Sequence, residues 1–193
     1  MSKIVFMGDS ITEYIQYVYK DKIGDESDVI KYFGVENIGV GNYMRYCWPH
    51  VDKDNVDYYV LLIGTNNISR PDCDYDNRET LDDLVEKFKE FINLITCESS
   101  SKLIVQSIYP TKYEWEKNDI IFVNNQLKEY CESVDIHYID IYSLIKTEDG
   151  LINSEYSDDG IHPNYKGYDF ILNEIYNHIK LDMENVIKKE KTV

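Results

Sequence analysis

Three residues that together could carry out acyl transfer lie near opposite ends of the chain. Ser10 follows a short apolar run, within residues 8–12 (GDSIT). Asp159 and His162 lie within residues 159–163 (DGIHP), the acid three positions before the histidine. A serine hydroxyl attacks an ester carbonyl when a histidine takes its proton and a carboxylate orients that histidine. The residue types therefore predict a catalytic triad with Ser10 as nucleophile, His162 as base and Asp159 as the orienting acid.

Each of these residues also has a purely structural explanation. Ser10 could cap the helix that follows it, because serine is a favoured N-cap residue. His162 could begin the last helix, although Pro163 biases it toward an extended backbone from which its ring projects. Asp158 is a rival orienting acid, one residue further from the histidine. The other histidines are less suited to act as the base, since they lie in a loop, at the start of a strand and on the final helix: His50, His137 and His178.

Ester cleavage also requires hydrogen-bond donors for the oxyanion. Asn66 follows an apolar run and Gly64, so its side-chain amide could reach the edge of a sheet. Gly41 could offer its backbone N–H at close approach, because glycine has no side chain. Asparagine beside glycine is also ordinary in turns, so each residue alone is weak evidence. Together with the triad they predict a complete acyl-transfer site.

Apolar runs alternate along the chain with segments of helical period. The expected strands are residues 3–7, 35–39, 58–63, 102–108 and 136–141, and the expected helices are 79–97, 118–134 and a segment after Pro163. Most of the strands are continuous apolar runs, as expected when both faces of a parallel sheet are covered. This alternation predicts a three-layer α/β domain with a mostly parallel sheet.

In such sheets the functional crevice lies beyond the carboxyl ends of the strands. This rule selects the turns at residues 8–10, 39–42, 64–67 and 109–110. The last of them begins a segment with four residues that could stack on a sugar, flank an acyl chain or simply pack: Tyr109, Pro110, Tyr113 and Trp115.

Size and charge limit the other possibilities. The 193 residues fit one domain, expected over residues 1–181, with a flexible tail over 182–193. The net charge of −16 repels nucleic acid and anionic membranes. The scattered cysteines predict neither a disulfide framework nor a zinc site. The apolar segment at the start of the chain is too short for the core of a signal peptide. No apolar run is long enough to span a membrane, so we expect a cytoplasmic protein.

The four motifs resemble the blocks of the SGNH (GDSL-type) hydrolases, in the order of that family, from residue 3 to about residue 172. They are residues 8–10, a glycine within 37–42 (NIGVGN), residues 64–66 and the Asp159-x-x-His162 pair. The resemblance implies a flavodoxin-like α/β/α sandwich with five parallel strands. It also implies ester hydrolysis without metal or cofactor. Its oxyanion hole would comprise the Ser10 and Gly41 N–H groups and the Asn66 side chain.

The second block departs from the family pattern. Many members place its glycine five residues after the asparagine, and here that position is Asn42. Gly41 lies one residue early. Asparagine tolerates left-handed backbone geometry better than most residues, so a donor could survive in either case. Gly41 is preferred as the donor, followed by Asn42 and then Gly39.

The favoured function is hydrolysis of a small-molecule, short-chain carboxylic ester, with an O-acetyl group on a carbohydrate or cell-envelope precursor as one candidate. The chain has no long apolar lid segment, which disfavours a triglyceride lipase. Lysophospholipid or thioester hydrolysis by the same residues is the alternative. A non-catalytic binding module would predict a defective triad. A flavin or nucleotide site would require a phosphate loop after the first strand, where Asp9 and Glu13 place negative charge. The oligomeric state stays open.

Overall fold

The computed structural model describes residues 2–19, 23–24, 26–68 and 80–190, with side chains to Glu184. It forms a five-stranded sheet in the order β2-β1-β3-β4-β5, in which every pair of neighbours is parallel. The strands are β1 (Lys3–Gly8), β2 (Val29–Gly34), β3 (Tyr58–Leu62), β4 (Lys102–Gln106) and β5 (His137–Ile139). The parallel sheet predicted from the apolar runs is therefore confirmed.

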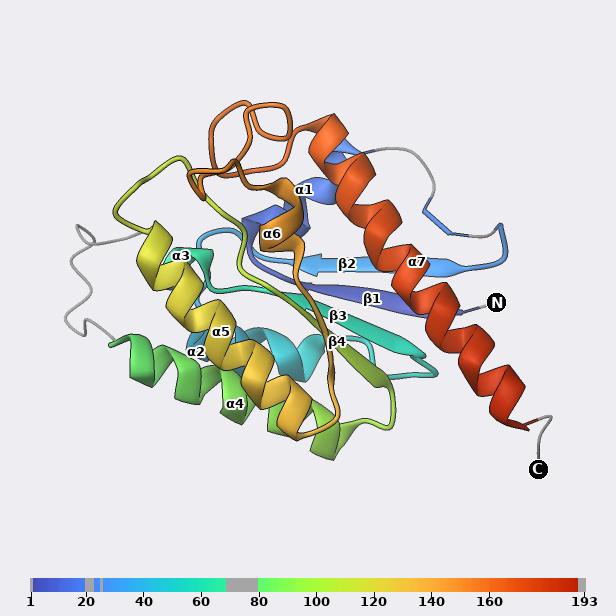
Figure 1. Cartoon of the computed structure of the whole chain (residues 1–193). Coiled ribbons are helices and arrows are strands. Elements are labelled where there is room, and N and C mark those ends of the chain that lie inside the picture. The colour runs from blue at the N-terminus through green and yellow to red at the C-terminus, as the bar shows by residue number, and fades with distance from the viewer. Residues whose placement is uncertain (1, 20–22, 25, 69–79, 191–193) are drawn as a thin grey trace.

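Helices cover both faces of this sheet (Figure 1). They are α1 (Ser10–Val18), α2 (Val40–Asn42), α3 (Thr65–Ile68), α4 (Leu81–Glu98), α5 (Lys117–Ser133), α6 (Ile141–Ile145) and α7 (Tyr165–Glu190). A π turn over Tyr43–Cys47 and a 3-10 turn over Trp48–His50 continue α2. The arrangement is the predicted α/β/α sandwich.

Alternate residues of the strands separate the core into two layers. Met7, Leu61 and Val105 pack with α4 and α5, whereas Phe6, Val60 and Ile104 pack with α1, α6 and α7. Successive strand residues point to opposite faces of a sheet, so a strand covered on both faces must be apolar at every position. This is why the central strands are continuous apolar runs.

The second strand lies earlier in the chain than predicted. The sequence predicts it over residues 35–39, but β2 spans Val29–Gly34. Asn37 has a φ of 57°, which ends extended structure in the predicted segment. Most residues of β2 are only partly buried, as in an edge strand. Such a strand carries a weaker apolar signal than the central ones, and the sequence pattern missed it for that reason.

The end of β1 comes very close to the neighbouring strand. A Cβ atom on Gly8 would lie 1.8 Å from the Leu62 carbonyl oxygen, so this position requires glycine. The register pairs Gly8 with Leu62 on one side and with Gly34 on the other. Ser10 therefore begins α1 at the carboxyl edge of the sheet, two residues beyond this contact.

Asp9 caps α1 and is completely buried. Its side chain accepts a hydrogen bond from the Ile11 N–H at 3.0 Å, and the second carboxylate oxygen has no hydrogen-bond partner among the described residues. Burial opposes its ionisation and raises the pKa of Asp9 to about 7, although the Ile11 N–H and the charge of His162 favour the ionised form. Asp9 is thus a buried acid beside Ser10.

The last helix passes the predicted domain boundary at residue 181. Helix α7 continues to Glu190. Asp182, the first residue of the predicted tail, accepts hydrogen bonds from Tyr58 at 2.7 Å and Lys102 at 2.5 Å. Residues 191–193 of that tail lie outside the described residues. Among the helices that are described, none combines the length and apolar character needed to cross a bilayer.

We expect Asp9→Asn to flatten the pH dependence of stability. The folded protein holds the Asp9 proton up to a pKa of about 7, whereas the unfolded chain releases it near 3.8. Between these values the folded state binds more protons, so rising pH favours unfolding. In urea denaturation, the free energy of unfolding of wild type should fall between pH 5 and pH 8 by roughly 1–3 kcal/mol more than that of the variant. Asp82→Asn, an exposed substitution on α4, is the control, and equal losses in wild type and Asp9→Asn would contradict the assignment.

Candidate active site

The fold brings Ser10 and His162 together from opposite ends of the chain. Ser10 begins α1 directly after β1, and His162 lies three residues before α7. The Ser10 Oγ and His162 Nε2 atoms are 2.9 Å apart, within hydrogen-bond distance. The Tyr168 hydroxyl on α7 donates to the Ile11 carbonyl on α1 at 2.7 Å, which links the two helices beside this pair.

Asp159 organises the turn that carries His162. Its Oδ2 lies 2.7 Å from His162 Nδ1. Its Oδ1 accepts hydrogen bonds from the Ile161 and His162 N–H groups, each at 2.8 Å. The Ser157 hydroxyl donates to the His162 carbonyl at 2.7 Å and accepts from the Gly160 N–H at 2.9 Å. The backbone of the turn and the edge of the imidazole are therefore held by the same carboxylate.

The environment of Asp159 favours its ionised form. Partial burial opposes ionisation, but the hydrogen bonds from the His162 ring and from the two N–H groups outweigh it and lower the pKa of Asp159 to about 2. A carboxylate that stays ionised can hold an adjacent imidazole in one tautomer and stabilise the imidazolium. The geometry thus has the electrostatic character that a serine–histidine pair requires.

The rival orienting acid points elsewhere. Asp158 accepts a hydrogen bond from Asn164 Nδ2 at 3.0 Å, next to the start of α7. Asn164 also caps this helix by accepting the Gly167 N–H at 3.0 Å. The helix begins at Tyr165, which agrees with the prediction of a helix after Pro163.

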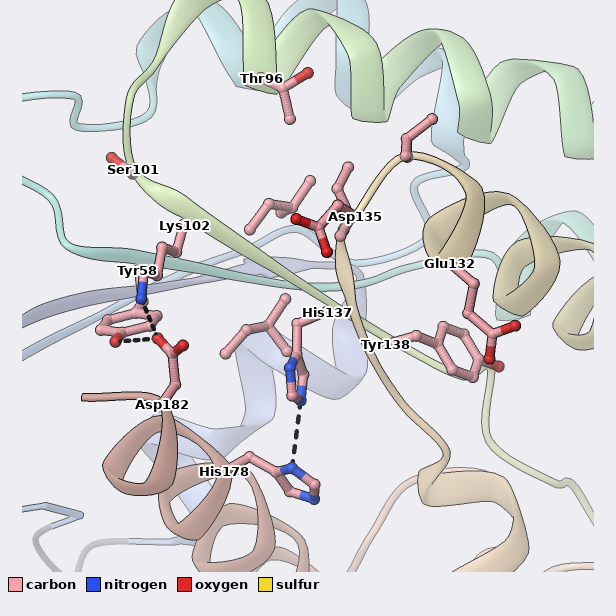
Figure 2. A pocket seen from close by; sticks show the side chains of 14 residues that line it. Tyr58, Thr96, Ser101, Lys102, Glu132, Asp135, His137, Tyr138, His178 and Asp182 are labelled. Carbon is pink, nitrogen blue, oxygen red and sulfur yellow. Dashed lines mark hydrogen bonds and ion pairs between the residues drawn. The ribbon is translucent and has the colours of Figure 1, made fainter. Parts of the chain in front are cut away.

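Two of the rival histidines lie at the opposite edge of the sheet. His137 Nε2 and His178 Nδ1 are 3.3 Å apart in a pocket of about 800 Å³, and Figure 2 shows this contact between the two rings, whose planes are inclined by 68°. Tyr58, Lys102 and His137 line this pocket and are the first residues of β3, β4 and β5. The pocket lies at the amino ends of the strands, whereas Ser10 lies beyond their carboxyl ends.

Asn66 lies in the short helix α3, which follows β3 on the edge of the sheet that carries Ser10. Its Nδ2 donates to the Ile38 carbonyl at 3.1 Å, which orients the amide. An amide nitrogen carries two N–H groups, and the second donates to no other described residue. Asn66 therefore retains one free N–H on a side chain that the Ile38 carbonyl, in the loop after β2, holds in place.

The first turn of α2 leaves two backbone donors. The Val40 N–H donates to Asn67 Oδ1 at 3.1 Å, and the Tyr43 N–H donates to the Gly39 carbonyl at 2.9 Å. Between them, the Gly41 and Asn42 N–H groups donate to no described residue. A Cβ atom on Gly39 would lie 2.9 Å from Asn67 Nδ2, so Gly39 also serves close packing. Its N–H likewise donates to no described residue, so Gly41, Asn42 and Gly39 all remain candidates at this position.

Two residues beside the site were not predicted from the sequence. The Tyr14 ring packs against the His162 imidazole in a tilted arrangement, with ring centroids 4.8 Å apart and planes inclined by 33°. Its hydroxyl donates to Glu36 Oε1 at 2.7 Å. The only signal for Tyr14 is its position four residues after Ser10, which places both side chains on one helix face. Glu36 has no such signal, because its contact depends on how β2 packs against α1.

The aromatic loop after β4 separates into buried and exposed parts. Tyr109 is buried and donates to Gln106 Oε1 at 2.6 Å, so it is a packing residue. Trp115 is 63% exposed and stacks on Tyr113 at a centroid distance of 4.5 Å. Lys112 joins this loop to the turn of His162 by donating from Nζ to the Asp159 carbonyl at 2.7 Å.

No three His, Cys, Asp or Glu side chains among the residues with described positions are arranged to hold a metal ion. The prediction that no structural zinc site is present refers in part to Cys73, which lies outside the described residues.

Solved structures with the same fold include several ester hydrolases. A GDSL-like lipase from Bacteroides thetaiotaomicron is 21% identical with a TM-score of 0.79, and the alignment covers 94% of this chain and 89% of that one. A member of the lipolytic G-D-S-L family from Veillonella parvula is 19% identical with a TM-score of 0.66, over 89% and 94%. An acetylxylan esterase from Geobacillus stearothermophilus, solved as a catalytic mutant, is 16% identical with a TM-score of 0.69, over 92% and 94%.

At these identities the structural similarity establishes the fold. No curated protein sequence matches the chain. The model of the GDSL-like Lipase/Acylhydrolase family, however, matches residues 6–170, a segment that contains all four sequence motifs and nearly the whole sheet. The chain therefore belongs to the GDSL-like lipase/acylhydrolase family and is a hydrolase of that class.

Proposed function

We propose that the protein is a serine esterase in which Ser10, His162 and Asp159 form the catalytic triad. The observation that carries this proposal is the continuous chain of short contacts from Ser10 Oγ through both nitrogens of His162 to the Asp159 carboxylate, at 2.9 and 2.7 Å. A serine, a histidine and an ionised acid in this order are what proton removal from a hydroxyl needs.

In the first step His162 Nε2 takes the proton of Ser10 as Oγ attacks the ester carbonyl carbon. The π electrons of the carbonyl move onto its oxygen and give a tetrahedral oxyanion. When this collapses, the bond to the leaving alcohol oxygen breaks, and the imidazolium returns its proton to that oxygen. Asp159 stays ionised throughout and stabilises the imidazolium. The product of this half-reaction is an acyl group on Ser10.

In the second step water replaces the alcohol. His162 takes a proton from the water, whose oxygen attacks the acyl carbon, and collapse of the second tetrahedral intermediate returns the proton to Ser10 Oγ. The carboxylic acid then leaves. Both intermediates carry charge on the same oxygen, so one set of donors serves both steps.

For the oxyanion hole we propose the Ser10 N–H, the Gly41 N–H and Asn66 Nδ2. None of these three N–H hydrogens has another acceptor among the described residues. Ser10, Gly41 and Asn66 lie in α1, α2 and α3, the helices that follow β1, β2 and β3 at the carboxyl edge of the sheet. Asn42 is the second choice for the backbone donor of α2, because its N–H is equally unpartnered. Donors held by the backbone need no reorganisation when charge develops.

The proposed substrate is a short-chain ester of a small molecule, with an O-acetylated carbohydrate as the leading candidate. The exposed Trp115–Tyr113 stack supports this candidate, because flat aromatic surfaces suit the apolar faces of sugar rings and Lys112 ties this loop to the turn of His162. The acetylxylan esterase from Geobacillus stearothermophilus acts on such an ester on the same fold. Lysophospholipid or thioester hydrolysis is the alternative for the same triad.

Ser10→Ala and His162→Ala should each remove nearly all esterase activity, a decrease of at least about 10⁴ in kcat. The reason is that nucleophile and base act as one unit. The measurement is p-nitrophenyl acetate hydrolysis together with labelling by a fluorophosphonate probe, which needs an activated serine. Ser143→Ala, on α6, is the matched control and should label normally. Wild-type turnover in Ser10→Ala would refute the proposed triad.

Asn66→Ala should lower kcat by roughly two to three decades with little change in KM, because an oxyanion donor acts mainly in the transition state. Asn67→Ala is the comparison, since Asn67 caps α2 through Oδ1 and should affect stability more than kcat. If Asn66→Ala keeps wild-type kcat, Asn66 is not a donor to the oxyanion.

The acyl-chain preference separates the substrate classes. With p-nitrophenyl esters from acetyl to decanoyl, we expect the highest kcat/KM at acetyl to butyryl and a decline beyond. A maximum at octanoyl or decanoyl would favour the lysophospholipase or thioesterase alternative.

Trp115→Ala should raise the KM for acetylated xylo-oligosaccharides and leave the KM for p-nitrophenyl acetate unchanged. Equal effects on the two substrates would contradict the proposed sugar contact.

A further inference from the structure

We propose that Tyr14 is a positioning residue for His162, whose ring it holds against Ser10 by a face contact that Glu36 anchors. This inference rests on the proposed function, since it takes His162 as the general base. It adds a residue outside the triad and the oxyanion hole, and it starts from a tilted pair of rings in contact that neither the motifs nor the triad geometry explains.

The Asp159 carboxylate fixes the turn and one edge of the His162 ring, but it does not contact the face of the ring. Its Oδ2 lies 2.7 Å from His162 Nδ1, and the His162 and Asp159 side chains are 25% and 55% exposed, so water also reaches this contact. The ring can still tilt about the Nδ1 contact. A second contact on the face of the imidazole would remove this freedom.

Tyr14 makes that contact from α1, the helix that also carries Ser10. It lies four residues after Ser10 on α1, so both side chains occupy one face of the helix. Its ring centroid is 4.8 Å from that of His162, with the planes inclined by 33°. Ser10 and Tyr14 thus contact His162 from the same helix, one at Nε2 and the other on the ring face.

Tyr14 is itself held in place by Glu36. Its hydroxyl donates to Glu36 Oε1 at 2.7 Å. This hydrogen bond raises the pKa of the Tyr14 phenol, so the hydroxyl remains a donor over the pH range of an esterase assay. Glu36 follows β2, whose end abuts α1 so closely that a Cβ atom on Gly34 would lie 2.1 Å from the Glu13 nitrogen. Glu36 itself is an exposed turn residue, and its backbone is positioned by the packed end of β2 two residues before it.

Tyr14 also interacts with the positive charge that develops on His162. An aromatic face attracts a cation, and the imidazole becomes cationic when it accepts the Ser10 proton. The ring of Tyr14 therefore favours the protonated base in the transition state as well as restricting its tilt. Both effects belong to the ring, and the hydroxyl acts only through Glu36.

The test compares Tyr14→Leu, which removes the ring, with Tyr14→Phe, which keeps it. We expect Tyr14→Leu to lower kcat for p-nitrophenyl acetate about fivefold to tenfold with KM unchanged within about twofold, and Tyr14→Phe to stay within about threefold of wild type. Tyr17→Leu is the matched control, because Tyr17 lies one turn further on the same helix and is 63% exposed. It should retain wild-type kcat.

A spectroscopic readout tests the contact independently of turnover. In protein labelled with ¹³C at histidine Cε1, the His162 resonance should shift in Tyr14→Leu, because the ring current of Tyr14 is lost, and should shift little in Tyr14→Phe or Tyr17→Leu. Tyr14→Met, an unbranched substitution that fits a helix, is the second variant if Tyr14→Leu fails to fold, and the same loss of kcat and the same shift are expected.

Three results would overturn the inference. They are wild-type kcat in both Tyr14→Leu and Tyr14→Met, an equal loss in Tyr14→Phe and Tyr14→Leu, and a change confined to KM, which would make Tyr14 a substrate contact. Ser10→Ala in the same assay separates this inference from the proposed function. If Ser10→Ala is inactive while the Tyr14 variants behave as wild type, the triad stands and only the positioning role fails.

Discussion

The Asp159 carboxylate is the group on which the arrangement of the site depends most. One oxygen accepts the Ile161 and His162 N–H groups and thereby shapes the turn, while the other lies 2.7 Å from the His162 ring. The turn also requires Gly160, whose φ is 85°. An acid three residues before a histidine can therefore fold the backbone and orient the side chain with a single group. This explains why the spacing of the two residues matters as much as their types.

The other half of the site depends on the close packing of β1. Gly8 allows β1 to approach the Leu62 carbonyl, and the parallel register then brings the turns after β1 and β3 to one edge of the sheet. Helices α1 and α7 pack on the same face through one apolar cluster, and the Tyr168 hydroxyl joins them at the Ile11 carbonyl. A serine at residue 10 and a histidine at residue 162 meet because of this packing. Burial of the Asp9 carboxyl beside them raises its pKa to about 7, because the uncharged protonated form is the one that burial penalises least.

The opposite edge of the sheet shows that reactive residue types alone do not make a hydrolase site. His137 and His178 lie 3.3 Å apart there, and Asp182 joins Tyr58 and Lys102 in the same pocket (Figure 2). These groups connect α7 to the first residues of three strands. No serine is within hydrogen-bond distance of either histidine among the described residues. The pair His137–His178 is thus better placed to hold α7 against the sheet than to activate a hydroxyl.

The sequence alone was sufficient for the parallel sheet apart from its edge strand β2, for the family, and for the residues that we propose as the triad. The reason is that central strands must be apolar on both faces and that the motifs lie directly after them. Prediction from the sequence was wrong for a strand that is only partly buried, and it missed side-chain contacts between elements that are distant in the chain. The edge strand β2 was placed too late, and the contacts of Tyr14, Glu36 and Asn67 were not predicted, although Tyr14 lies four residues after Ser10. Only the tertiary structure decides such contacts, because they depend on how α1, β2 and the turn of His162 pack together, and no local periodicity encodes that packing.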